Sequence, residues 1–137
     1  MELYDLDPAS TEAGPRLFNV SARTQVGTGG DVLIAGFVIV GDGPRRVLLR
    51  AVGPTLGGFG VAGVLADPTL ELYRGEEKIA TNDNWDTDDG RGAGAFPLAA
   101  GSKDAVIIRT LQPGAYSAKV AGVDDTTGVA LIEVYEW

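Results

Sequence analysis

The sequence predicts an all-β fold: a two-layer antiparallel β-sandwich, jelly-roll or immunoglobulin-like, with an N-terminal extension strand. The chain has 137 residues, enough to close one hydrophobic core, and 45% of them are hydrophobic, which is too apolar for disorder. Its 20 glycines and 7 prolines are too many for a helical bundle. Segments rich in β-branched and aromatic residues alternate with turn signals along the chain, as they do in a sandwich.

Nine segments have the composition and the period-2 alternation of strands. They are residues 2–6, 17–26, 32–40, 47–52, 69–74, 78–81, 105–111, 115–121 and 129–137. Glycine, proline and aspartate between them mark chain reversals, most clearly at residues 27–30, 41–44, 74–76 and 112–114. The order of strands and turns favours a sandwich over a closed barrel.

Three details refine this expectation. Residues 32–40 and 47–49 are almost continuously apolar, which predicts strands in the centre of their sheets rather than at an edge. Tyr116 follows the turn at 112–114, where its hydroxyl can bond back to nearby backbone as in a tyrosine corner. Arg50 and Arg109 interrupt apolar strands, so each is expected to face solvent or to meet a carboxylate.

The two ends of the chain resemble each other. Residues 2–6 read Glu-Leu-Tyr-Asp-Leu and residues 133–137 read Glu-Val-Tyr-Glu-Trp. A polar stretch bounded by proline and glycine, typical of a linker, follows the first copy at residues 7–15. We therefore divide the chain into an N-terminal donor strand with its linker, residues 1–14, and a β-sandwich domain, residues 15–137.

An isolated strand on a tether must bury its apolar face, and unpaired strand backbone favours addition to another sheet. The sequence predicts that residues 2–6 complete the sheet of a neighbouring copy, which would join copies head to tail. The alternative is that these residues pair within their own domain. The side chains expected to take part in assembly are Leu3, Tyr4, Leu6, Tyr135 and Trp137.

Composition excludes several classes of function. The chain has no histidine and no cysteine, so the usual catalytic triads and zinc sites cannot form, and we expect no enzyme activity. A net charge of −8 argues against nucleic acid as a partner. No apolar run approaches the roughly 20 residues of a membrane span.

The densest polar cluster lies at residues 82–90 and suggests an alternative function. Asp83, Asn84, Asp86 and Asp88 carry oxygen ligands that could hold calcium, although the spacing only partly matches an EF-hand loop. Trp85 could stack on a sugar or fold over the end of the sandwich. A carbohydrate-binding or adhesive module supported by calcium is the alternative that follows; no other cofactor is expected.

Glycan attachment is a further expectation. Asn19, Val20 and Ser21 match the acceptor pattern for N-glycosylation, and Ser10 and Thr11 offer hydroxyl groups on a looser segment.

The chain resembles a β-sandwich repeat of uncharacterised function from large secreted bacterial proteins. The similar segments are residues 16–23, 33–39, 46–56, 66–73, 80–85 and 127–135. In such proteins a repeat finishes with a strand like Glu-Val-Tyr-Asp and a linker, so residues 2–7 look like the last strand of a preceding repeat. The chain is also similar to the protomer of glycan-coated extracellular fibrils seen by cryo-EM in environmental water.

Together these observations predict a structural subunit of an extracellular or cell-surface fibril. The resemblance implies identical subunits as partners and covalently attached glycans, and it supplies no catalytic motif.

Overall fold

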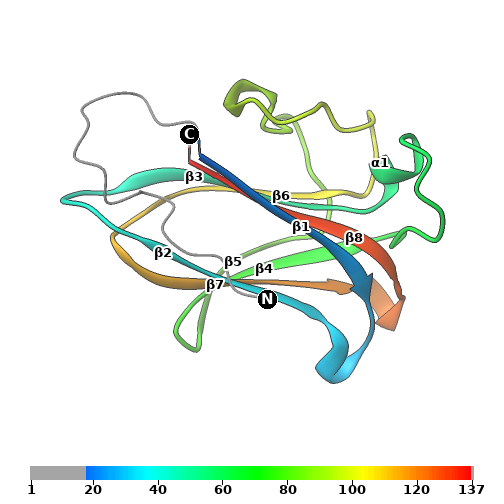
Figure 1. The fold of residues 1–137 in the computed structure, drawn as a ribbon, viewed down its shortest axis with the longest axis horizontal. Coiled ribbons are helices and arrows are strands. Elements are labelled where there is room, and N and C mark those ends of the chain that lie inside the picture. Colours follow the sequence, from blue (N-terminus) through cyan, green and yellow to red (C-terminus); the bar gives the residue numbers. More distant parts are fainter. Residues whose placement is uncertain (1–17, 137) are drawn as a thin grey trace.

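A computed structural model of the chain describes the backbone of residues 18–136 and the side chains of residues 21–136. The first sheet has the order β1-β8-β3-β6 and the second has the order β2-β7-β4-β5 (Figure 1). The strands are β1 (Phe18–Val26), β2 (Leu33–Ile39), β3 (Arg45–Val52), β4 (Pro68–Arg74), β5 (Glu77–Asn82), β6 (Ala105–Leu111), β7 (Gly114–Gly122) and β8 (Gly128–Glu136). The helical pieces are α1 (Pro54–Gly57) and the 3-10 turns η1 (Gly29–Asp31), η2 (Arg91–Ala93) and η3 (Val123–Asp125).

The strand order is that of a jelly roll. All neighbouring strands are antiparallel. The chain changes sheet at every connection except the β4–β5 hairpin. The prediction of a two-layer antiparallel sandwich is therefore confirmed, and of its two variants the strand order matches the jelly roll.

The main core lies between the two sheets. Buried side chains alternate with more exposed ones along β2, β4 and β7, as expected for strands with one face in a core. The rings of Phe37 and Tyr116 stack with their centroids 5.6 Å apart. The Tyr116 hydroxyl donates to the carbonyl of Gln112 at 2.6 Å, which confirms the predicted tyrosine corner.

A second apolar layer covers the outer face of the first sheet. The segment from residue 83 to residue 104 leaves β5 and passes over this face before β6 begins (Figure 1). Leu48 and Tyr135 on the outer face pack with Ala93 and Ala95 of the segment. Gly90 has a φ of 84°, and a Cβ there would lie 2.3 Å from Leu48 Cδ2, so glycine allows the segment to approach the sheet closely.

The predicted strands agree with those observed to within two residues at each end, for all the segments that the structure describes. The predicted strand at residues 2–6 and the boundary between residues 14 and 15 lie outside the described residues. The central position predicted for residues 47–49 is confirmed, because β3 lies between β8 and β6. For residues 32–40 the prediction fails within the described chain, because β2 pairs with β7 alone and forms an edge.

No helix among residues 18–136 has the length and hydropathy that crossing a membrane requires.

Candidate functional site

Among residues 18–136, no strand closes the side of the sandwich where β1 and β2 lie next to each other. Both are edge strands, one in each sheet. A groove of about 220 Å³ lies where the end of β1 meets the start of β2. Its lining residues are Thr24, Gln25, Asp31, Val32, Leu33 and Ile34.

The four edge strands differ sharply in composition. β5 carries Glu77 and Lys78, β6 carries Arg109, and β1 carries Arg23, all of them exposed. β2 reads Leu-Ile-Ala-Gly-Phe-Val-Ile and has no polar side chain. Charged residues on an edge normally discourage further pairing, so β2 is the edge that lacks this protection.

Ile34 lies on the outer face of β2 and is half exposed to solvent. At 50% exposure it is one of two large exposed hydrophobic residues in the described chain; the other is Phe59 at 64%. Leu33, Ala35, Phe37 and Ile39 point the other way, into the core. Strand β2 therefore offers apolar side chains on both faces and an unpaired backbone edge within residues 18–136.

The assembly residues predicted from the sequence fall in two places. Leu3, Tyr4, Leu6 and Trp137 lie outside the described residues. Tyr135 is only 6% exposed and packs in the outer cluster with Leu48, so the structure places it inside the protomer rather than on its surface.

A buried charged network lies beneath the covering segment. Arg50 is fully buried, and its Nε donates to Glu133 Oε1 at 2.8 Å. Its Nη1 donates to the carbonyls of Asp89 and Phe96 at 2.7 and 2.6 Å, and the guanidinium lies 4.5 Å from the centre of the Phe96 ring. The expectation for the two arginines is confirmed, because Arg50 meets a carboxylate and Arg109 is exposed to solvent.

The Tyr135 hydroxyl completes this network by donating to Glu133 Oε2 at 2.7 Å. Burial raises the pKa of Tyr135, and the hydrogen bond to Glu133 raises it further. Tyr135 is therefore a neutral hydrogen-bond donor at neutral pH, and Glu133 accepts hydrogen bonds from both Arg50 and Tyr135.

The predicted calcium ligands do not converge. Asp83, Asn84, Asp86 and Asp88 are all exposed, and the Asn84 amide donates to Asp83 at 3.2 Å. Asp88 Oδ1 accepts the backbone N–H of Gly90 at 2.9 Å, as in an Asx turn. Among residues 18–136, no group of three or more acidic side chains is placed to hold a metal ion.

Sequence reasoning missed Asp89, the buried acid of this segment. It accepts the Leu98 backbone N–H at 2.9 Å and bonds to Arg91 Nη2 at 2.9 Å. The Arg91 hydrogen bond holds the pKa of Asp89 well below its usual range and outweighs burial, which acts in the opposite direction. The sequence signal that could have indicated this ion pair is the position of Asp89 two residues before Arg91.

Asp89 should make the stability of the protein depend on pH in the acid range. Its pKa is lower in the folded state, so its contribution is complete above the unfolded-state pKa of about 3.9 and is lost as the pH falls toward the folded-state pKa. We expect Asp89→Asn to lower the free energy of unfolding at neutral pH by about 1.5 to 3 kcal/mol. In urea titrations the difference from the parent should shrink below about pH 4. A difference independent of pH would contradict this role, and Asp88→Asn is the matched control.

Trp85 is fixed by a second buried acid. Its indole Nε1 donates to Ser102 Oγ at 3.0 Å, and its backbone N–H donates to the carbonyl of Asp104 at 2.8 Å. Asp104 is fully buried and accepts hydrogen bonds from the Ser102 hydroxyl, the Thr55 hydroxyl and the Gly53 backbone N–H. Asp104 therefore ties Trp85, α1 and the start of β6 together.

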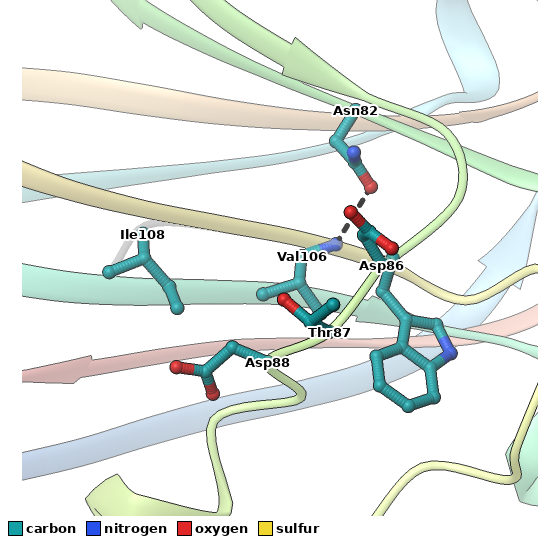
Figure 2. Close-up of a pocket in the computed structure, with 7 residues that line it drawn as sticks. Asn82, Asp86, Thr87, Asp88, Val106 and Ile108 are labelled. Carbon is teal, nitrogen blue, oxygen red and sulfur yellow. Dashed lines mark hydrogen bonds between the residues drawn. The ribbon is translucent and has the colours of Figure 1, made fainter.

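A second groove, of about 200 Å³, lies on the outer face beside β6. Figure 2 shows Val106 and Ile108 of β6 facing the segment that carries Asp86, Thr87 and Asp88. Asn82 and Trp85 complete the lining. The Asn82 side-chain oxygen accepts the Val106 backbone N–H at 3.1 Å, which leaves the amide nitrogen as a donor.

The side chains of the predicted glycan acceptors Asn19, Ser10 and Thr11 lie outside the described residues. Ser10 and Thr11 precede the described residues. Asn19 lies in β1, where its backbone is paired with that of Tyr135. Attachment at these residues stays a prediction.

Comparison with known proteins identifies the fold of the chain but not its family. No protein-family model matches the sequence, and no curated protein matches it significantly. Among solved structures the chain is similar to the pre-peptidase C-terminal domain of a collagenase from Bacillus anthracis, with a TM-score of 0.53 and 14% identity. The match covers 85% of this chain and 88% of that domain. At this identity the similarity shows a shared β-sandwich fold.

Proposed function

We propose that the protein is a non-catalytic structural subunit of an extracellular bacterial fibril. In this proposal residues 2–6 of one copy add to the β2 edge of the next. The observation that carries it is β2 itself. Among the four edge strands of residues 18–136, β2 alone lacks a polar side chain, and its Ile34 is exposed.

The chemistry of the two partners is complementary. Residues 2–6 offer Leu3 on one face and Tyr4 with Leu6 on the other, because side chains alternate along a strand. Strand addition would supply main-chain hydrogen bonds, and each fully buried apolar side chain would contribute about 1.5 to 3 kcal/mol before ordering costs. The outward-facing Ile34 would gain a cross-strand neighbour.

Head-to-tail growth follows from the position of the two surfaces. The donor precedes the sandwich in sequence and the acceptor is an edge within it, so the contact joins unlike surfaces of two copies. Contacts of this kind produce open filaments when the rotation between copies does not close.

The composition of the chain and its structural neighbour also support a non-catalytic role. The absence of histidine and cysteine from the whole sequence removes the common catalytic groups. The same fold occurs as a pre-peptidase C-terminal domain of a bacterial collagenase, which is consistent with a sandwich that works as a module. An extracellular location and covalent glycans remain part of the proposal.

Deleting residues 1–7 should abolish polymerisation and leave a folded monomer. The donor strand is then lost, whereas the sandwich of residues 18–136 keeps its own core. Electron microscopy and sedimentation of the purified protein measure the result. Undiminished fibres from the truncated chain would refute strand exchange.

The variant Ile34→Lys tests the acceptor, because it places a charge on β2. Lysine on natural edge strands prevents pairing with another chain, so this variant should not polymerise. Phe59→Lys, at the other exposed hydrophobic residue, is the matched control and should still polymerise. The truncated chain retains an acceptor and the Ile34→Lys chain retains a donor. Mixed together they should form dimers that grow no further, and an absence of dimers would contradict β2 as the acceptor.

A further inference from the structure

We propose that the groove beside β6 binds one neutral sugar ring of a glycan, without a metal ion. The groove is lined by Asn82, Trp85, Asp86, Thr87, Asp88, Val106 and Ile108. This site lies apart from the β2 edge and does not depend on assembly.

The size and surface of the groove suit a single ring. Its volume of about 200 Å³ is below the roughly 300 to 1,000 Å³ of pockets for drug-sized ligands. Val106 and Ile108 form an apolar floor on β6, and polar side chains of the crossing segment form the opposite wall (Figure 2). A pyranose has this same division, with an apolar C–H face and a polar rim of hydroxyls.

The aromatic side chain of the groove is held in place before any ligand arrives. Trp85 is half-buried, its indole N–H is bonded to Ser102, and its backbone N–H is bonded to Asp104. Because the indole N–H is occupied, the ring offers an apolar surface rather than a hydrogen bond. A fixed aromatic surface lowers the entropy cost of binding.

The polar groups match sugar hydroxyls. Asp86 makes no hydrogen bond within the described residues, and Asp88 uses only Oδ1, for the Gly90 backbone N–H. These carboxylates accept bonds from ligand hydroxyls, and the Asn82 amide nitrogen donates one. Acceptors and a donor therefore line the same groove.

Charge defines the class of sugar. The lining holds Asp86 and Asp88 and no lysine or arginine, so it repels uronic acids and sulfated or phosphorylated sugars. No group of three or more acidic side chains in this segment is placed to hold a metal ion, so the proposal has the carboxylates accept directly from the sugar hydroxyls. The site therefore favours neutral pyranoses.

The test uses the full-length protein with Trp137→Phe, which leaves Trp85 as the only tryptophan. Its fluorescence is titrated with the methyl glycosides of glucose, galactose, mannose and N-acetylglucosamine. We expect at least one of them to shift the emission with a saturating curve and a Kd on the order of 1 mM. Methyl glucuronide should bind at least about tenfold more weakly.

Three controls make the outcome decisive. Asp86→Ala removes an exposed acceptor without breaking an intramolecular bond and should weaken binding about tenfold. Asp83→Ala changes another exposed acid, which lies outside the groove, and should leave binding unchanged. EDTA should have no effect.

The proposal is overturned if none of the four neutral glycosides changes Trp85 emission at tens of millimolar, or if Asp86→Ala binds like the parent. Loss of binding in EDTA would overturn the metal-free mechanism. None of these results bears on whether truncated chains polymerise, so the two proposals fail independently.

Discussion

Replacing Arg50 with methionine should lower the free energy of unfolding by about 3 to 5 kcal/mol, because Glu133 would remain buried without its counter-charge. The guanidinium also serves the carbonyls of Asp89 and Phe96, so the covering segment would lose its attachment to β3. Urea unfolding measures the loss of stability. Limited proteolysis should show faster cleavage within residues 83–104 than in the parent.

Arg109→Met is the matched control, since Arg109 is exposed in the same sheet. Surface substitutions of this kind usually change stability by less than about 0.5 kcal/mol. Combining Arg50→Met with Glu133→Gln removes the stranded charge and should recover part of the loss. Equal stability of the Arg50 and Arg109 variants would show that the buried pair does not hold the segment.

Replacing Asp104 with alanine should cost about 3 to 5 kcal/mol, because several donors lose their acceptor at once. These donors are the backbone N–H groups of Gly53 and Thr55 and the hydroxyls of Thr55 and Ser102. Ser102 would then no longer be held against Trp85. In the Trp137→Phe background, Trp85 emission should shift to longer wavelength as the ring becomes more exposed.

Asp104→Asn keeps one acceptor oxygen and should be intermediate in stability. Asp86→Ala, at an exposed acid without a hydrogen bond in the described chain, should match the parent. If Asp104→Ala unfolds at the same urea concentration as Asp86→Ala, the link between α1, Trp85 and β6 is not a stabilising one.

The strands were predictable from the sequence because each is bounded by a turn with its own local chemistry. Gly75 turns β4 into β5 with a φ of 61°, and the turn before Tyr116 fixes the corner that starts β7. Such signals lie within a few residues of the elements they delimit.

The edge position of β2 could not be predicted from the same pattern. An apolar run shows that a strand has apolar neighbours on both faces, but not which strands pair with it. The apolar run at residues 33–39 therefore resembles the sequence of the central strand β3, although one edge of β2 is unpaired in the described chain. This mismatch between composition and position is the basis of the proposed acceptor.

The second layer was also beyond sequence reasoning. Arg50 meets Glu133 across 83 positions of the chain, and nothing local marks either residue as buried. The sequence predicts a calcium loop in the acidic segment and does not distinguish its acids from one another, yet Asp89 is buried and Asp86 is exposed. Only tertiary packing distinguishes them, since the burial of each acid depends on the sheet that the segment covers.

The pairing of β1 with β8 determines how the sandwich responds to tension. Residue 18 lies opposite residue 136, so the chain enters and leaves the sandwich at the same point (Figure 1). Bonds between antiparallel strands run across them, so a pull on these two ends opens the pairs one at a time and meets little resistance.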